Sequence, residues 1–325
     1  MRSVKPYIPG RLNTATAIDI WIARNHQGFL DVGWVQTNDS GQLEGSTVVP
    51  ATNTDQYLGY RIYEINDKYS ADSPVFVKVN FYVLGTTGGT NESYNPYAPY
   101  VCYQVGFATD GDGNFVGSYT PTSPTTPTKS VYTLGPAFNT ESFSFFTKVD
   151  GFTAAITEYK HAAHGMNLLG SNFFALERVV LGGEVLLDEV IYVHNHTAVQ
   201  SSARQPFAYS RLSKGGVTGP FQHPSHNPRA SADANGLIAV PFDFSTESGL
   251  FESNHLVALR AGSDFGEVEL SFDGVTSKKF ILFKSSTITG AGTHNLGVLQ
   301  TSGGLVAAVD TREIAYGVVG VGYSD

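Results

Sequence analysis

The residues best suited to metal chemistry are histidines, which occur in three close pairs. The pairs are His161 and His164, His194 and His196, and His223 and His226. In His194-Asn195-His196, the two-residue spacing would place both imidazoles on one face of a strand, which makes half of a metal site. A threefold assembly would bring three such pairs to one ion. We nevertheless favour solvated or locally hydrogen-bonded histidines for every pair. We therefore expect no metal site and keep only His194 and His196 as candidates for one.

A short acidic segment, Asp110-Gly111-Asp112-Gly113-Asn114, is similar to the start of a calcium-binding loop. Such a loop has glycine at its sixth position and glutamate at its twelfth. Phe115 and Pro121 stand at these two positions here. We therefore interpret the segment as a tight hairpin turn whose glycines adopt positive φ.

Motifs for nucleophilic catalysis and phosphate binding are absent from the sequence. It has no Gly-x-Ser-x-Gly elbow and no Gly-x-x-x-x-Gly-Lys-Ser/Thr loop. A glycosidase needs two facing carboxylates. Acidic residues on predicted strands are the only basis for such a pair, namely Glu158, Glu177, Asp188 and Glu189. Because sequence spacing does not bring two of them together, we expect no enzymatic activity, no catalytic residue and no cofactor.

A tyrosine-rich segment is the best candidate for ligand binding. Tyr94-Asn95-Pro96-Tyr97-Ala98-Pro99-Tyr100 places three aromatic rings on a chain that two prolines stiffen. Rigid tyrosines lose little entropy on binding and suit either a sugar or a protein neighbour. The alternative is a loop that folds over its own sheet, with the rings as lids. Both interpretations stay open, with Tyr94, Tyr97 and Tyr100 as the binding-loop candidates.

The composition excludes several classes of protein. Only 15% of the 325 residues are charged and the net charge is −9, which argues against nucleic-acid binding because no basic stripe is present. The single cysteine, Cys102, rules out an internal disulfide and is best interpreted as a small buried hydrophobe. The N-terminus lacks the apolar segment of a signal peptide, and no window is apolar enough to span a membrane. We expect folding in a reducing cytoplasm.

The elements that must position these residues are mostly strands. The stretch from Leu58 to Gly117 predicts a meander of three strands, over residues 58–65, 74–84 and 100–107. In the second strand, alternation assigns five apolar residues to one face, namely Val75, Val77, Val79, Phe81 and Val83. It assigns four others to the opposite face, namely Phe76, Lys78, Asn80 and Tyr82.

Flanking segments extend this β-rich pattern. We predict one helix over Asn13 to His26, ended by Gly28. The dipeptides Asp150-Gly151 and Gly182-Gly183 predict hairpin turns. The glycine-rich tail from Thr287 is only weakly self-supporting.

The predicted fold is all-β, an antiparallel β-sandwich or jelly-roll-like architecture with one N-terminal helix and extended loops and termini. Residues 1–200 would form the helix and the sandwich domain. Residues 201–325 would form a second β-rich region, either separate or part of the same domain.

The order of several segments resembles that of virion structural proteins of tailed bacteriophages. The resemblance lies in Tyr60-Arg61-Ile62-Tyr63-Glu64-Ile65-Asn66-Asp67, in Ala71-Asp72-Ser73-Pro74-Val75-Phe76-Val77-Lys78-Val79, and in Gly106-Phe107-Ala108-Thr109-Asp110-Gly111-Asp112-Gly113-Asn114. Gly33-Trp34 and Phe173-Phe174-Ala175-Leu176-Glu177-Arg178 continue it. It covers roughly residues 13–180, and it is one of pattern and order that carries over no functional residue.

This resemblance implies a non-enzymatic building block of the particle, tail- or baseplate-associated and homo-oligomeric. Its partners would be other virion proteins and copies of itself. Its location would be the virion, assembled in the cytoplasm of a bacterial host. One alternative is a glycan-binding adhesin or receptor-binding protein that contacts a host surface glycan. Another is a head-associated decoration or fibre protein.

Overall fold

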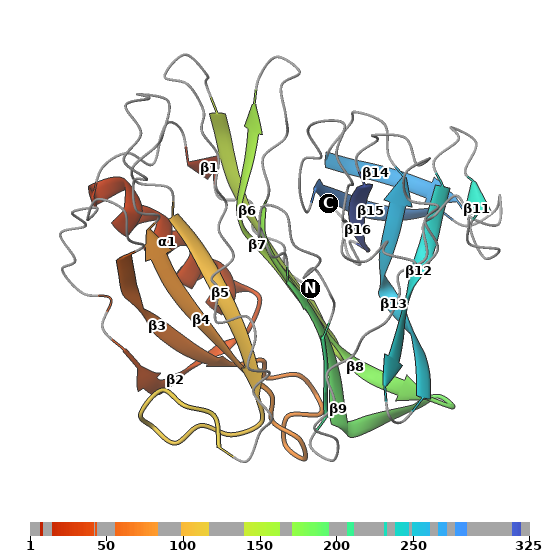
Figure 1. Cartoon of the computed structure of the whole chain (residues 1–325), viewed down its shortest axis with the longest axis horizontal. Coiled ribbons are helices and arrows are strands. Elements are labelled where there is room, and N and C mark those ends of the chain that lie inside the picture. Colours follow the sequence, from red (N-terminus) through yellow and green to blue (C-terminus); the bar gives the residue numbers. More distant parts are fainter. Residues whose placement is uncertain are drawn as a thin grey trace, which may run out of the picture.

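The computed structural model describes the chain in fourteen segments. They are residues 7–8, 15–41, 43, 56–83, 99–116, 140–162, 171–194, 207–210, 231–232, 238–246, 249–260, 266–271, 277–284 and 314–319. Within these segments the fold consists of antiparallel sheets and a single helix, α1 (Ala15–Asp31). The predicted all-β fold class with one N-terminal helix is therefore confirmed (Figure 1).

Helix α1 ends later than the sequence predicts, and the prediction that Gly28 ends it was wrong. The helix continues to Asp31, and the left-handed cap is Gly33, with φ of +89°. The amide of Trp34 donates to the carbonyl of Phe29 at 3.0 Å and that of Gly33 to Leu30 at 2.9 Å, as in a Schellman motif. Gly28 has a packing role instead, because a Cβ there would lie 2.1 Å from Cε2 of Phe146.

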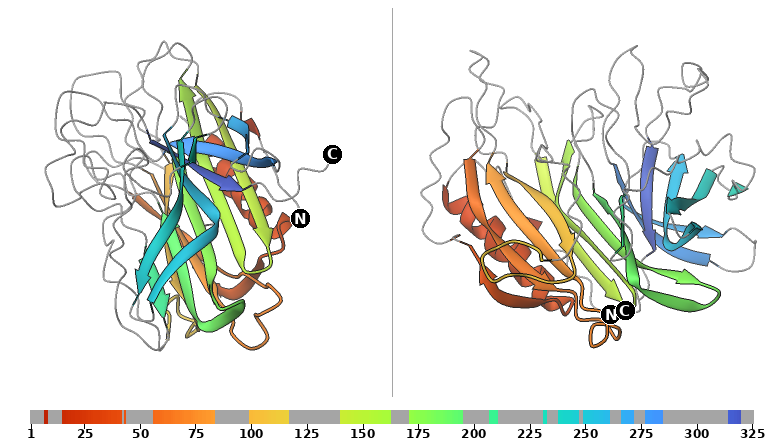
Figure 2. Two further views of the ribbon diagram at one scale, coloured as in Figure 1. Left: turned by 90° about the vertical axis from the view of Figure 1, so that its right-hand side faces the viewer. Right: turned by 60° about the horizontal axis from the view of Figure 1, so that its bottom comes forward.

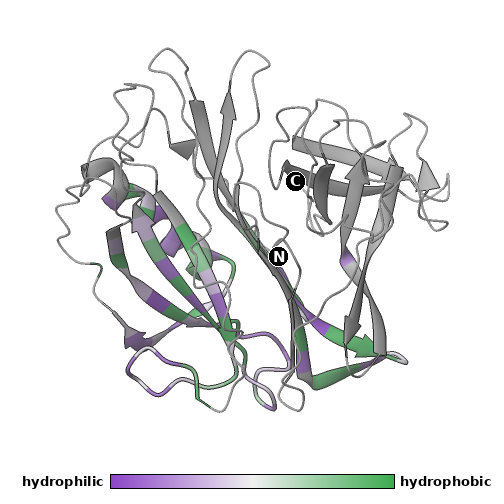
Figure 3. Cartoon of the chain, in the orientation of Figure 1, coloured by the Kyte–Doolittle hydropathy of each residue, from purple (hydrophilic) through white to green (hydrophobic). Residues whose placement is uncertain are grey.

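A four-stranded antiparallel sheet follows the helix. Its strands are β2 (Val35–Ser40), β3 (Gln56–Glu64), β4 (Phe76–Val83) and β5 (Pro99–Gly106), paired in the order β2-β3-β4-β5. Val75, Val77, Val79 and Phe81 are fully buried, as the alternation predicts. Figure 3 shows this alternation of hydrophobic and hydrophilic residues along the strands.

A second antiparallel sheet has six strands in the order β1-β6-β7-β8-β9-β10. Their bounds are β1 (Tyr7–Ile8), β6 (Thr140–Val149), β7 (Phe152–Ala162), β8 (Ser171–Leu181), β9 (Glu184–His194) and β10 (Phe207–Ser210). Gly151 joins β6 to β7 with φ of +78°, and Gly182 and Gly183 join β8 to β9 with φ of +60° and +88°. Both predicted hairpins are thus present. The domain boundary at residue 200 stays a prediction; β10, which follows it, pairs with β9.

The hydrophobic core lies where these two sheets and α1 meet. The ring of Phe29 stacks on Trp34 at 4.6 Å between centroids and meets Phe146 edge-on at 4.9 Å. Tyr103 of β5 stacks on Phe174 of β8 at 4.6 Å. Aromatic rings contributed by separate segments therefore make one continuous core.

The C-terminal strands form a third antiparallel sheet, in the order β11-β12-β13-β16-β15-β14. Their bounds are β11 (Ser231–Ala232), β12 (Ile238–Thr246), β13 (Gly249–Arg260), β14 (Gly266–Ser271), β15 (Ser277–Lys284) and β16 (Ile314–Val319). The second sheet, which contains β6 to β9, lies between the other two sheets (Figures 1 and 2). Strand β16 lies inside the third sheet, between β13 and β15, so this part of the glycine-rich tail is paired on both sides by its own chain.

Candidate functional site

The face of the four-stranded sheet that points away from the core carries the most varied polar and aromatic side chains. Register pairs Tyr57 with Tyr82, Tyr60 with Asn80, and Lys78 with Gln104. Residues directly opposite one another share a face. We call these six residues the outer face.

Two tyrosines form the first part of the outer face. The ring centroids of Tyr57 and Tyr82 lie 5.0 Å apart with a 47° tilt. The hydroxyl of Tyr57 donates to Oδ1 of Asn80 at 3.2 Å, and Nδ2 of Asn80 donates to Oε1 of Gln104 at 3.4 Å. Burial of the Tyr57 hydroxyl raises its pKa, and the neighbouring Tyr82 and Tyr60 raise it further, so it stays a neutral donor. Tyr57 is 48% exposed. An anchored hydroxyl thus holds an open ring in place.

A closed polar cluster around Asp39 adjoins the outer face at Tyr60. The Asp39 carboxylate accepts hydrogen bonds from the hydroxyl of Tyr60 at 3.0 Å and from that of Thr109. Burial alone would raise the pKa of Asp39, but bonds from Thr109, the Gly113 amide, Tyr60 and the Gly111 amide lower it. The carboxylate is therefore a negatively charged anchor between the 109–113 loop and the sheet.

The loop that is similar to a calcium site is organised by its own amides. The Asp110 carboxylate accepts bonds from the Asp112 and Asn114 amides at 2.7 and 3.0 Å and from Nδ2 of Asn114 at 3.0 Å. These bonds, led by the Asn114 side chain, lower the pKa of Asp110. The Lys78 ammonium donates to the Gly113 carbonyl at 2.6 Å. The geometry matches the predicted turn, with Gly111 and Gly113 at φ of +86° and +88°.

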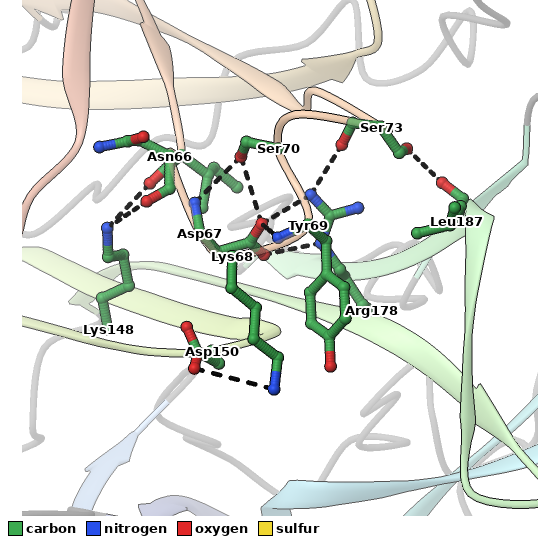
Figure 4. A network of polar contacts seen from close by, with 11 residues as sticks. Asn66, Asp67, Lys68, Tyr69, Ser70, Ser73, Lys148, Asp150, Arg178 and Leu187 are labelled. Atoms are coloured by element: carbon green, nitrogen blue, oxygen red, sulfur yellow. Dashed lines mark hydrogen bonds and ion pairs between the residues drawn. The ribbon is translucent and has the colours of Figure 1, made fainter.

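A buried ion pair connects the β3–β4 turn to β8 of the second sheet (Figure 4). Nε and Nη2 of Arg178 donate to the two carboxylate oxygens of Asp67 at 2.6 and 2.9 Å. Nη2 also donates to the Ser73 carbonyl at 2.8 Å, and the Ser73 hydroxyl donates to the Leu187 carbonyl. The Arg178 and Asp67 side chains are only 1% and 2% exposed. This pair is closed to ligands and holds two sheets together.

Lys148 of β6 makes a second tie to the same turn (Figure 4). Its ammonium donates to the carbonyls of Gly33, Ile65 and Asn66 at 3.0, 3.1 and 2.9 Å. Burial lowers the pKa of Lys148, while the nearby carboxylates of Asp67 and Asp150 raise it. All three ammonium protons are thus directed at backbone oxygens, which is a structural arrangement.

A histidine–tyrosine pair joins α1 to β3. Nδ1 of His26 lies 2.8 Å from the Tyr63 hydroxyl. Burial, together with the smaller effect of the Arg61 charge, lowers the pKa of His26 to about 4. Burial also raises the pKa of Tyr63. Both groups are neutral at pH 7, so the pair works as a hydrogen bond between helix and sheet.

The histidine pairs are placed by the structure only in part. His194 is the last residue of β9, in register with Phe174, and His161 in β7 is in register with Glu141. Four of the six paired histidines lie outside the described residues, namely His164, His196, His223 and His226. Within the segments that the structure describes, no three His, Cys, Asp or Glu side chains gather to hold a metal ion. The metal candidates stay predictions.

The predicted tyrosine loop is also placed only in part. Tyr94 and Tyr97 lie outside the described residues. Tyr100 is in β5 and in register with Tyr82. Sequence analysis missed Tyr57 and Gln104 as partners of Asn80 and Tyr82. The alternation in β4 had already put Asn80 and Tyr82 on one face, and only the strand register was needed to add the other two.

Of the acidic residues considered for a glycosidase pair, Glu177 is the best defined. Its Oε1 lies 2.9 Å from Nδ1 of His255 in β13, and the His255 ring stacks on Phe152 at 4.5 Å. His255 thus connects the third sheet to the second sheet. Glu189 is buried on β9. The side chains of Glu158 and Asp188 are outside the described part.

Comparisons with known proteins identify no relative: no family model, curated protein or solved structure matches this chain. The single helix of the described part is neither long enough nor apolar enough to cross a membrane. Interpretation of function therefore depends on the residues themselves.

Proposed function

We propose that the protein is a structural component of a tailed bacteriophage virion, associated with the tail or baseplate, and that it is not an enzyme. The observation that carries this proposal is the use of its buried charges. Arg178 donates to Asp67 of the β3–β4 turn, and Lys148 donates to the Ile65 and Asn66 carbonyls of the same turn, so these charges tie parts of the protein together. A body braced in this way suits a load-bearing subunit, and the sequence resemblance over residues 13–180 supports the same class.

The proposed partners are copies of the same chain and other virion proteins, in a particle assembled in the bacterial cytoplasm. Exposed apolar side chains of the β8–β9 hairpin support this. They are Val180 at 40%, Leu181 at 53% and Leu187 at 37%, and the outer end of β8 is coloured as hydrophobic in Figure 3. Exposed apolar side chains on a projecting hairpin are typical of a protein contact.

Light scattering of the full chain over a range of concentrations tests the proposal. We expect a homo-oligomer that the charged substitution Leu181→Asp dissociates, because burying an unpaired carboxylate opposes association. Val35→Asp, at an equally open position of β2, is the matched control and should leave the mass unchanged. A chain that stays monomeric, or an oligomer that Leu181→Asp leaves intact, would contradict the hairpin contact.

A second candidate function is glycan binding at the surface of the particle, as an adhesin or receptor-binding protein. The specific observation in its favour is the open ring of Tyr57 beside Tyr82 on the outer face. Aromatic rings of this kind suit sugar rings as well as protein partners. A head-associated decoration or fibre protein is a third candidate, with the same assembly chemistry at another position in the particle.

A further inference from the structure

We propose that Ser73 fixes the direction of the tip of the β8–β9 hairpin and so presents that tip, preorganised, to a second copy of the chain. The tip is defined as residues 179–187. This inference rests on the assembly contact proposed above, and it adds the residue of the β3–β4 turn that positions the contact.

The tip extends beyond the strands that flank the hairpin. Toward the tip, the last register pair of β7 with β8 is Phe152 with Glu177, and the Arg178 amide then donates to the Gly151 carbonyl at 2.7 Å. Pairing of β10 with β9 goes no further than Glu189. The tip is therefore a ribbon of two strands, and such a ribbon is only marginally stable in water without further support.

A large bulge separates the tip from the rest of the hairpin. Val180 is in register with Val185, and Arg178 is in register with Val190. One residue of β8 therefore lies opposite residues 186–189 of β9. A bulge bends the strand that carries the extra residues, and Figures 1 and 2 show the hairpin turning sideways toward its tip. The direction of the tip is thus set at this bulge.

Ser73 holds the bulge from outside the hairpin. Its hydroxyl donates to the carbonyl of Leu187, which is one of the bulged residues. Within the part of the chain that the structure describes, no other hydrogen bond reaches the tip from outside the hairpin. Ser73 is 0% exposed, and its own carbonyl accepts a bond from Nη2 of Arg178. The bulge is therefore tied to the buried Arg178–Asp67 ion pair.

The tip suits a contact between copies of this chain. Because the net charge of the chain is −9, two copies repel one another where their charged surfaces meet. Glu184 is the only charged residue among residues 179–187, and Val180 and Leu181 are exposed. The same weakly charged, apolar surface of two copies can therefore meet. Because the direction of the tip is already set, docking requires little further ordering.

Hydrogen exchange on the full chain, with light scattering of the same samples, tests this inference. Ser73→Ala removes the hydroxyl and keeps the backbone carbonyl to which Arg178 donates. We expect the amides of residues 184–187 to exchange about three- to tenfold faster than in the parent. Association of copies should weaken by about the same factor, as expected for the loss of one hydrogen bond.

Ser70→Ala is the matched control in the same turn. The Ser70 hydroxyl bonds to the amide and the carboxylate of Asp67 and not to the hairpin. We expect this variant to lower the urea midpoint without changing exchange at the tip or association. If Ser73 contributed to overall stability alone, Ser73→Ala would behave in the same way.

The inference is overturned if the tip of Ser73→Ala exchanges like that of Ser70→Ala, or if a faster-exchanging tip leaves association unchanged. With an oligomeric parent, either result refutes only the positioning role of Ser73. A monomeric parent refutes the assembly contact and with it the docking of the tip, while the exchange comparison still decides whether Ser73 holds the tip.

Discussion

Removing one partner of the Arg178–Asp67 ion pair should destabilise the protein more than any surface change. Asp67→Asn leaves a guanidinium that is 1% exposed without its counter-charge, which costs about 3–5 kcal/mol of unfolding free energy. Arg178→Met is expected to cost less, about 2–3 kcal/mol, as a loss of charged hydrogen bonds. The reason is that the Asp67 carboxylate still accepts hydrogen bonds from the Ser70 hydroxyl at 3.2 Å and from the Tyr69 amide at 3.1 Å.

The double variant Asp67→Asn/Arg178→Met distinguishes this reasoning from a simple packing effect. In the double variant no charge is left buried without a partner. Its loss of unfolding free energy should therefore be smaller than the sum of the two single-variant losses by more than about 1 kcal/mol. Urea unfolding followed by tryptophan fluorescence is a suitable assay, because Trp21 and Trp34 are 0% and 2% exposed in the same core. Additivity within about 0.5 kcal/mol would refute the argument.

Lys68→Ala is the matched control for these variants. Lys68 and Asp150 form an ion pair at 3.8 Å whose side chains are 57% and 60% exposed. Exposed pairs of this kind contribute little to stability, because water screens the charges. We expect the unfolding midpoint of Lys68→Ala to match that of the parent.

Two further predictions concern α1. Since the pKa of His26 falls from 6.5 to about 4 on folding, its contribution is complete above pH 6.5 and is lost as the pH falls through about 4. For this partly buried ring, the loss of unfolding free energy is about 1–2 kcal/mol. His26→Gln should therefore flatten the dependence of the urea midpoint on pH between those two values. A dependence that is unchanged in the variant would contradict this prediction. Gly28→Ala should lower the unfolding free energy by about 1–3 kcal/mol, because the new methyl group clashes with Phe146. In thermal melts, adding Phe146→Leu should relieve this clash. Stabilisation by Gly28→Ala alone would show that the higher helix propensity of alanine outweighs the clash.

Local signals in the sequence were sufficient for the meander and the hairpins. Alternation placed Val77 and Val79 on the core side of β4, and Asp150-Gly151 marked the β6–β7 turn. These features depend on neighbouring residues alone, because side-chain direction alternates along a strand and glycine adopts positive φ at little cost.

Long-range packing explains where the prediction of the fold was wrong. Gly28 looked like a helix end, but its missing side chain makes room for Phe146, which is 118 positions further along the chain. The tail at Ile314–Val319 looked weakly self-supporting, yet hydrogen bonds to β13 and β15 on both sides place it inside a sheet. Neither partner can be identified from local propensity.

The candidate site depended on register in the same way. Tyr57 meets Tyr82 because the pairing of β3 with β4 shifts between Tyr57 and Gly59. A bulge of this kind reverses which residues of a strand face solvent, and sequence spacing does not reveal it. The Arg178–Asp67 pair, 111 positions apart, was equally hidden.

The ties from the β3–β4 turn to distant strands have a consequence for folding during synthesis. The partners of that turn lie on β6, β8 and β9, so the turn cannot complete its contacts until Leu187 has left the ribosome. At about 5–20 residues per second, the roughly hundred residues after β4 take about 5–20 s to make. Throughout that interval the valine-rich face of the meander has no covering sheet. A nascent chain in this state is a natural client for a chaperone that binds extended apolar segments.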